Sequence, residues 1–174
     1  MKNILAIAGS LRAKSTNLTI LEIIAEMFGD KINLTIYDGL GGLPQFNPDL
    51  DTDEPLAAVA DWRQQIKRCD GVLICSPEYV FSVPAALKNA LEWTVSSADF
   101  YNKPTAVITA SSLGEKAHES LVLILKTIDA KIGGNSALLI SHAQTKIKDG
   151  KVLDAKSLEQ LNLLIESFLH TIDE

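Results

Sequence analysis

The side chains best suited to chemistry begin directly after the first apolar run of the chain, which ends at Gly9. Hydroxyl, amide and guanidinium groups are concentrated there, just before a segment with helical spacing. Free backbone amides and the helix dipole attract an anion to the amino end of a helix. Serine, threonine and asparagine add hydrogen-bond donors, and arginine adds positive charge. The pattern predicts a phosphate site, with candidate residues Ser10, Arg12, Ser15, Thr16 and Asn17.

A simpler interpretation of this segment is that Ser15 or Thr16 only caps the helix. A cap uses one hydroxyl, however, and leaves Arg12 and the other donors unexplained. The segment also differs from two familiar phosphate motifs. Only Gly9 stands where a dinucleotide fingerprint has three glycines, and no Gly-Lys-Ser/Thr sequence of a P-loop occurs. A terminal monophosphate therefore suits the segment better than a pyrophosphate bridge.

A second candidate segment, residues 76–84, carries a proline near each end and two aromatic side chains. Proline fixes the backbone and suits the first turn of a helix, so the loop is expected to be rigid and to lead into a helix. A rigid loop can present backbone amides and an aromatic ring to a flat heterocycle. Partial burial of Tyr79 and Phe81 against a sheet explains the same residues equally well.

Each of these segments follows a short apolar run, and further runs of this kind occur along the chain. Several are apolar at nearly every position, which is typical of strands in a parallel sheet that is covered by helices on both faces. The predicted strands are Ile4–Ala8, Leu34–Tyr37, Gly71–Cys75, Thr105–Thr109 and Ser136–Ser141.

Segments with the apolar spacing of helices lie between and after these runs. The residues between the second strand and the second helix, Asp38–Glu54, are rich in glycine, proline and acidic side chains and are predicted to form one long loop. The predicted helices are Leu18–Phe28, Pro55–Ile66, Ala85–Val95, Ser120–Ile132 and Leu158–Phe168.

Strands and helices alternate through residues 1–174, which predicts a single α/β domain with right-handed crossovers and a doubly wound parallel sheet. Five strands of this kind favour the flavodoxin-like order 2-1-3-4-5. Ligands of such sheets bind beyond the carboxyl ends of the strands, where the winding reverses. The loops after the first, third and fourth strands are therefore the expected binding site.

Together, the two candidate segments resemble the signatures of the NADPH-dependent FMN reductase family, which includes quinone, azo-dye and chromate reductases. The resemblance covers nearly the whole chain. The matching residues read Gly9-Ser10-x-Arg12-x-x-Ser15-x-Asn17 and Pro77-Glu78-Tyr79-x-x-Ser82-x-Pro84-x-x-Leu87-Lys88-Asn89-Ala90-x-x-Trp93. The chain departs from the family pattern at Val80, where an asparagine is frequent, at Ala85, where a glycine is frequent, and at Gly114, where many relatives have two glycines.

The resemblance implies that FMN is the ligand and that Ser10, Arg12, Ser15, Thr16 and Asn17 hold its phosphate. It also implies that the edge of the isoalloxazine ring is lined, largely by backbone groups, at Pro77, Glu78, Tyr79 and Val80. Ser111, in the loop after the fourth strand, is the further contact that it implies.

The activity implied by the resemblance is reduction of a small acceptor, such as a quinone, a flavin or an azo compound, by NADPH or NADH. Hydride would pass through N5 of the flavin in a ping-pong reaction, and the chain would form a homodimer or homotetramer. No catalytic side chain is expected, because the cofactor carries the difficult chemistry.

Composition restricts the partners and the location that we expect. The formal net charge of −6 offers no basic face for nucleic acid or an anionic membrane. No stretch approaches the length of a membrane span, and no signal peptide is recognised. The two cysteines show no disulfide framework, and neither they nor the three histidines have the spacing of metal ligands. A cytoplasmic protein without a bound metal is the expectation.

Two other classes of function fit the same segments. An electron carrier of the flavodoxin type would bind FMN without oxidising NAD(P)H itself, but the phosphate loops of such carriers generally lack a cation, and Arg12 argues against this class. A phosphate- or nucleotide-binding module without catalysis is the other alternative.

Overall fold

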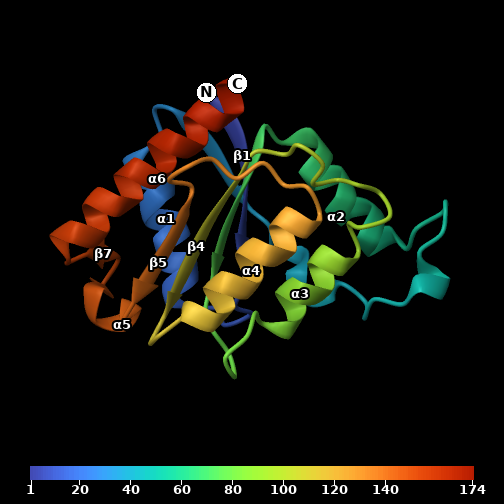
Figure 1. Cartoon of the computed structure of the whole chain (residues 1–174), viewed down its shortest axis with the longest axis horizontal. Coiled ribbons are helices and arrows are strands. Elements are labelled where there is room, and N and C mark those ends of the chain that lie inside the picture. Colours follow the sequence, from blue (N-terminus) through green and yellow to red (C-terminus); the bar gives the residue numbers. More distant parts are fainter.

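Five parallel strands form the sheet at the centre of the molecule, in the order β2-β1-β3-β4-β5 (Figure 1). The computed structural model describes residues 1–174. The predicted flavodoxin-like α/β fold and its strand order are confirmed. The strands are β1 (Lys2–Ala8), β2 (Ile32–Ile36), β3 (Gly71–Ser76), β4 (Thr105–Ser111) and β5 (Ala137–Ser141).

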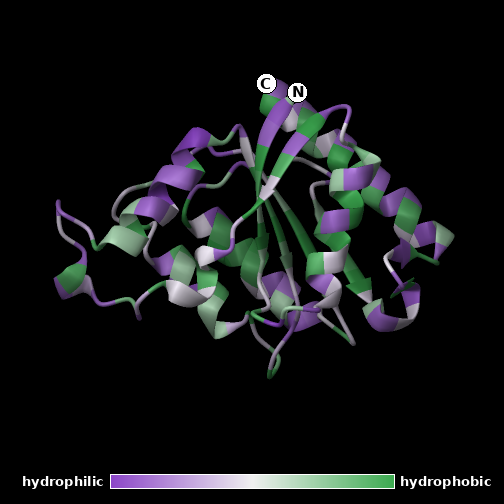
Figure 2. Ribbon diagram, turned by 180° about the vertical axis from the view of Figure 1, so that it is seen from behind, coloured by the Kyte–Doolittle hydropathy of each residue, from purple (hydrophilic) through white to green (hydrophobic).

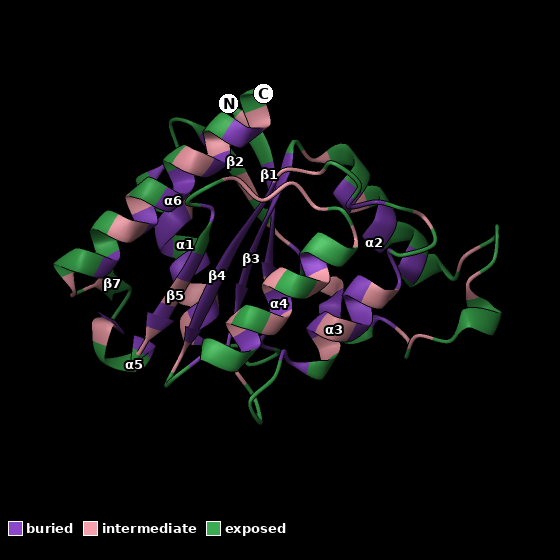
Figure 3. Ribbon diagram, in the orientation of Figure 1, coloured by how far each residue is buried: buried purple, intermediate pink, exposed green.

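Helices cover both faces of the sheet, as the continuous apolar runs of the strands predicted. One hydrophobic cluster joins the sheet to α1 and α6, and a second joins it to α2, α3 and α4. Figure 3 shows the buried strands between these two layers of helices. The helices are α1 (Thr16–Met27), α2 (Ala57–Arg68), α3 (Ala85–Glu92), α4 (Glu115–Thr127) and α6 (Ala155–Asp173).

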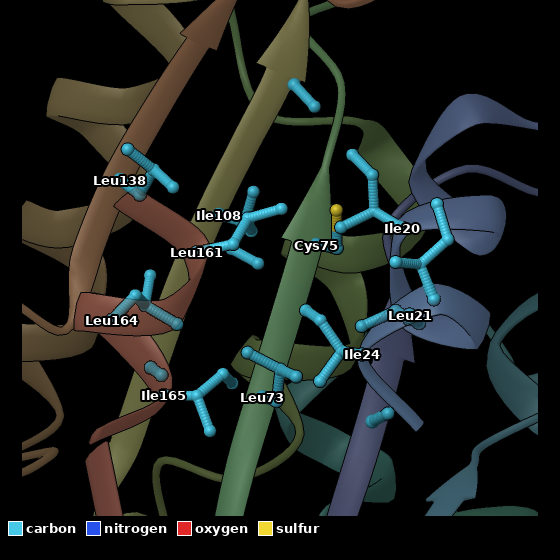
Figure 4. Packing of buried hydrophobic residues seen from close by; sticks show 14 of the residues in the cluster. Ile20, Leu21, Ile24, Leu73, Cys75, Ile108, Leu138, Leu161, Leu164 and Ile165 are labelled. Atoms are coloured by element: carbon cyan, nitrogen blue, oxygen red, sulfur yellow. The ribbon is translucent and has the colours of Figure 1, made fainter. Parts of the chain in front are cut away.

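Strand β3 shows how one apolar run supplies both halves of the core. All of its residues are buried, and alternate side chains enter opposite clusters. Leu73 and Cys75 pack on the side of α1 and α6 (Figure 4), whereas Val72 and Ile74 pack on the side of α2 and α3. Burying one such aliphatic side chain contributes roughly 1.5–3 kcal/mol. Figure 2 shows the same division, with hydrophobic strands inside and hydrophilic residues on the outer faces of the helices.

Helix α4 differs most from its predicted bounds. It begins at Glu115 and ends at Thr127, whereas the apolar spacing predicted Ser120–Ile132. Its first turn is polar, so the spacing of apolar residues does not reveal it. Gly114 precedes the helix with a φ of 94°, in the left-handed region that glycine tolerates best. Helix α3 is also shorter than predicted, since it ends at Glu92 rather than at Val95.

Several short elements were not predicted. The segment expected to be one loop contains 3₁₀ turns at Gly39–Gly42 and Pro48–Leu50. After β5 the chain forms the one-turn helix α5 (Ala143–Lys146) and a small antiparallel hairpin, β6 (Ile147–Lys148) and β7 (Lys151–Val152). The termini lie together at the amino edge of the sheet (Figure 1), whereas α5 lies at the carboxyl edge, near the predicted site. No helix has the length and apolar character needed to cross a lipid bilayer.

Candidate functional site

One pocket opens where the loops after β1, β3 and β4 meet at the carboxyl edge of the sheet. Every residue predicted for the site lines this pocket except Val80. Two residues of α5, which the sequence did not suggest, also line it. The lining residues are Ser10, Arg12, Ser15, Thr16, Asn17, Pro77, Glu78, Tyr79, Ala110, Ser111, Ser112, Ala143 and Gln144.

Gly9 brings the first of these loops close to its neighbours. Its amide donates a hydrogen bond of 2.8 Å to the carbonyl of Cys75, which extends the pairing of β1 with β3. A Cβ atom at this position would lie 2.5 Å from Ser76 Oγ and 3.1 Å from Leu87 Cδ2. Only glycine therefore allows the loop after β1 to leave the sheet this close to β3 and α3.

Ser15 and Asn17 are buried, and both are oriented by hydrogen bonds within the protein. Ser15 Oγ accepts a hydrogen bond of 3.1 Å from the amide of Leu18, so Ser15 is the cap of α1 that the simpler interpretation proposed. Its hydroxyl hydrogen still faces no acceptor within the chain. Asn17 Oδ1 accepts from the thiol of Cys75 at 3.3 Å. Burial raises the pKa of that thiol, so it keeps its proton and leaves the amide group of Asn17 as a donor.

Arg12 is the cation of the pocket, and its charge is not neutralised by the protein. The residue is exposed and takes part in no ion pair within the chain. Its backbone amide donates to Ser10 Oγ at 3.3 Å, which holds the loop in a turn. The guanidinium group and the amino end of α1 thus give this part of the pocket a positive character that suits an anion.

Glu78 joins two of the loops, a role that the sequence did not suggest. Its Oε2 atom accepts from the amide of Ala117 at 2.9 Å, and its Oε1 atom accepts from the amide of Gly114 at 3.2 Å. Gly114 has no side chain with which to cap α4, so the carboxylate of Glu78 replaces the missing cap from another loop.

Tyr79 joins the other pair of loops. Its hydroxyl lies 3.0 Å from Ser10 Oγ in a hydrogen bond between the loops after β3 and β1. The backbone then turns sharply. Two backbone hydrogen bonds of 3.0 Å between Tyr79 and Ser82 close this turn. Val80 stands in this turn with 96% of its surface exposed, which explains why it does not line the pocket.

Ala143 and Gln144 were missed because the chain returns to the site after β5. The rule for doubly wound sheets points to the loops at the reversal of winding, whereas β5 is the edge strand. The sequence offered no signal for them, because α5 is a single turn whose apolar spacing is too brief to recognise.

A larger cavity, about 480 Å³ against about 160 Å³ for the pocket described above, lies between α2 and the segments around Asp51 and Ser96. The two least exposed charged groups in its lining, Arg63 and Asp51, neutralise one another. Arg63 Nη2 lies 2.6 Å from Asp51 Oδ1, and the same guanidinium group donates to the carbonyl of Trp93. These contacts tie the segment before α2 to the end of α3, and they leave the pocket at the carboxyl edge as the better candidate for an anionic ligand.

Known proteins similar to this chain share a common description. The model of the family described as NADPH-dependent FMN reductase matches residues 2–145. The NADH-dependent flavin reductase subunit 2 of Lactobacillus johnsonii is 28% identical over 98% of this chain and 97% of its own length. The 2-hydroxy-1,4-benzoquinone reductase of a Burkholderia species is 30% identical over 95% and 93% of the two chains.

Among solved structures, the flavoenzyme NAD(P)H:(acceptor) oxidoreductase FerB of Paracoccus denitrificans is similar throughout. It superimposes with a TM-score of 0.85 and 27% identity, over 99% of this chain and 98% of that one. Similarity of this extent supports the same flavodoxin-like fold over nearly the whole chain.

Proposed function

Because the chain belongs to the NADPH-dependent FMN reductase family, we propose that it binds FMN in the pocket at the carboxyl edge of the sheet. Membership of this family makes the chain an NAD(P)H-dependent oxidoreductase of the flavin- and quinone-reductase type. The observation that carries the proposal of FMN is the unpaired Arg12 beside the amino end of α1, among uncharged donors that face the same pocket.

The residues of the pocket fit the chemistry of this cofactor. A phosphate monoester carries nearly two negative charges and accepts many hydrogen bonds. Arg12, Thr16 and the amide group of Asn17 offer charge and donors for it. Pro77 and the exposed ring of Tyr79 offer a flat, mostly apolar edge for the isoalloxazine ring. Ser111 and Ser112 add hydroxyl groups from the third loop.

FMN, when bound, supplies the centre that exchanges hydride or electrons with the two substrates. The protein's own contribution is to bind and to orient. The loop after β1 holds the phosphate, and the hydrogen bond between Ser10 and Tyr79 fixes the distance between the phosphate end and the ring end of the pocket. Glu78 fixes the third loop against the second. No side chain is assigned as a proton donor or acceptor in the reaction.

The acceptor that we propose is a small quinone or flavin, with NADH or NADPH as the reductant. The names of the flavin and benzoquinone reductases among the relatives support this choice. The two substrates would use the same open side of the pocket in turn, which is the basis of ping-pong kinetics. Steady-state rates of NAD(P)H oxidation, measured at several fixed acceptor concentrations, test this. Parallel double-reciprocal lines are expected, and intersecting lines would contradict the shared site.

We also propose that the chain forms a homodimer or homotetramer. An apolar groove runs between α3 and α4, and the exposed side chains of Val95 and Leu123 lie along it. Contact with a second copy would remove these side chains from water. Light scattering of the purified protein tests the proposal, and the mass of a single chain would contradict it.

A further inference from the structure

The two-residue turn after Tyr79 has an uncommon backbone conformation. Its residues, Val80 and Phe81, are poorly suited to that conformation. Val80 and Phe81 have φ values of 51° and 55°, and Tyr79 and Ser82 close the turn with paired backbone hydrogen bonds. Two successive residues with positive φ between hydrogen-bonded neighbours define the turn type that strongly favours Asn-Gly. A β-branched residue such as valine is an outlier in this conformation.

Burial of the two side chains does not compensate for this unfavourable backbone conformation. Val80 is 96% exposed and Phe81 is 69% exposed. Figure 3 shows the turn as the exposed tip of the loop between β3 and α3. Both the conformation and the contact with water therefore disfavour these two side chains in the isolated chain. Backbone strain of this kind concentrates at functional sites, where another contact compensates for it.

The loops that form the polar pocket also carry exposed apolar side chains, and the turn is one place where they occur. Most of the residues that line the pocket are polar, but each of its three main loops also exposes a large apolar side chain to water. Leu11 lies in the loop after β1 and Leu113 in the loop after β4. The loop after β3 contributes Tyr79, Val80 and Phe81, and Figure 2 shows hydrophobic residues at its tip. Exposed apolar side chains on the loops of a polar pocket suit ligands with a polar end inside the pocket and a flat apolar part outside it.

We propose that Val80 and Phe81 contact the acceptor and make the enzyme select planar apolar acceptors with fused rings over small or hydrophilic ones. The inference rests on the proposed function, because it concerns the acceptor that is reduced there. Continuity with the pocket supports it, since Tyr79 both lines the pocket and begins the turn. The side chains of Val80 and Phe81 together are comparable in size to the face of a bicyclic ring. They are too few to form a stable protein interface, which buries about 800 Å² on each partner.

The test replaces Val80 and Phe81 by Asn-Gly, the pair that this backbone conformation favours. The double variant Val80→Asn/Phe81→Gly should fold at least as stably as the original chain, with an equal or higher Tm, because Asn-Gly suits the turn. The kcat/KM for a naphthoquinone is measured against that for ferricyanide, a hydrophilic anion, in the same preparation. We expect the ratio of the two values to fall about tenfold, the order of effect that lost apolar contacts have on discrimination.

Two further variants make the result specific. Phe81→Leu keeps an apolar side chain and should retain most of the preference for the naphthoquinone. Leu163→Asn removes an exposed apolar side chain from α6, away from the pocket, and should leave the ratio unchanged.

An unchanged ratio in the double variant would overturn the inference. So would a change of oligomeric state in the double variant, because the turn would then contact a second copy. Complete lack of NAD(P)H oxidation by the original chain, with either acceptor, would instead contradict the proposed function, and the inference with it.

Discussion

The carboxylate of Glu78 accepts a hydrogen bond of 2.9 Å from the backbone amide of Ala117, although 39 positions separate the two residues. A second bond joins the same carboxylate to the amide of Gly114. The loop after β3 thus caps the helix that follows β4. Two loops of the candidate site are consequently held as one unit before any ligand binds.

Removing this cap should weaken both the fold and the site. For Glu78→Ala we expect a loss of about 1–2 kcal/mol in the free energy of unfolding, because the amides of Gly114 and Ala117 at the start of α4 lose a charged acceptor. Affinity for FMN should fall as well, since the third loop is no longer fixed. Urea unfolding and fluorescence titration measure the two effects. Glu119→Ala is the matched control on the same helix, because its exposed pair with Lys116 contributes little.

Arg12 should contribute directly to the affinity for FMN. Its replacement by alanine is expected to weaken binding by about 1–3 kcal/mol, the range of a charge-assisted hydrogen bond. Lys14→Ala removes the same charge from the same loop, but Lys14 does not line the pocket and its replacement should have a smaller effect. Equal losses in the two variants would point to long-range charge rather than to contact with the phosphate.

The hydrogen bond between Ser10 and Tyr79 can be measured with a double-mutant cycle. Tyr79→Phe and Ser10→Ala each remove one partner, and the pair should couple by about 0.5–1.5 kcal/mol in the free energy of FMN binding. Tyr101→Phe serves as a control, because this exposed tyrosine does not line the pocket. Additive effects of the two replacements would show that the bond does not hold the loops together for the cofactor.

His118 should make stability depend on pH in one direction. Burial lowers the pKa of His118 below its ordinary 6.5, and the ring lies 2.9 Å from the buried hydroxyl of Thr109. The unfolded chain therefore binds more protons than the folded one, and stability should fall as pH decreases from about 6.5 through the lower, folded pKa. Urea unfolding at several pH values measures this. His118→Gln should flatten that part of the curve, and an unchanged slope would contradict the assignment.

The strands and their order were predictable because each apolar run reports burial on both faces, as in β3. The donors after β1 were equally visible, because they are adjacent in sequence. The start of α4 was not, since the group that caps it is Glu78, in a different loop. A contact between residues 39 positions apart leaves no trace in the local sequence pattern.

The turn at Val80 illustrates a second limit. A two-residue turn with positive φ favours residues other than valine and phenylalanine. The residue types at this position therefore do not predict the turn. Ala143 and Gln144 show a third, because α5 is only one turn long and its apolar spacing is too brief to recognise. In each case the local structure could not be predicted from the local sequence and is known only from the tertiary structure.

The activity proposed for this chain is binding of FMN and transfer of electrons to it from NAD(P)H. It is tested most directly by loading the purified protein with FMN, excluding oxygen and adding NADH or NADPH while the visible absorbance is recorded. We expect the bound flavin to bleach and a quinone added afterwards to restore its colour. A bound flavin that neither NADH nor NADPH bleaches would contradict the reductase activity, and FMN fluorescence that the protein leaves unchanged would contradict the site itself.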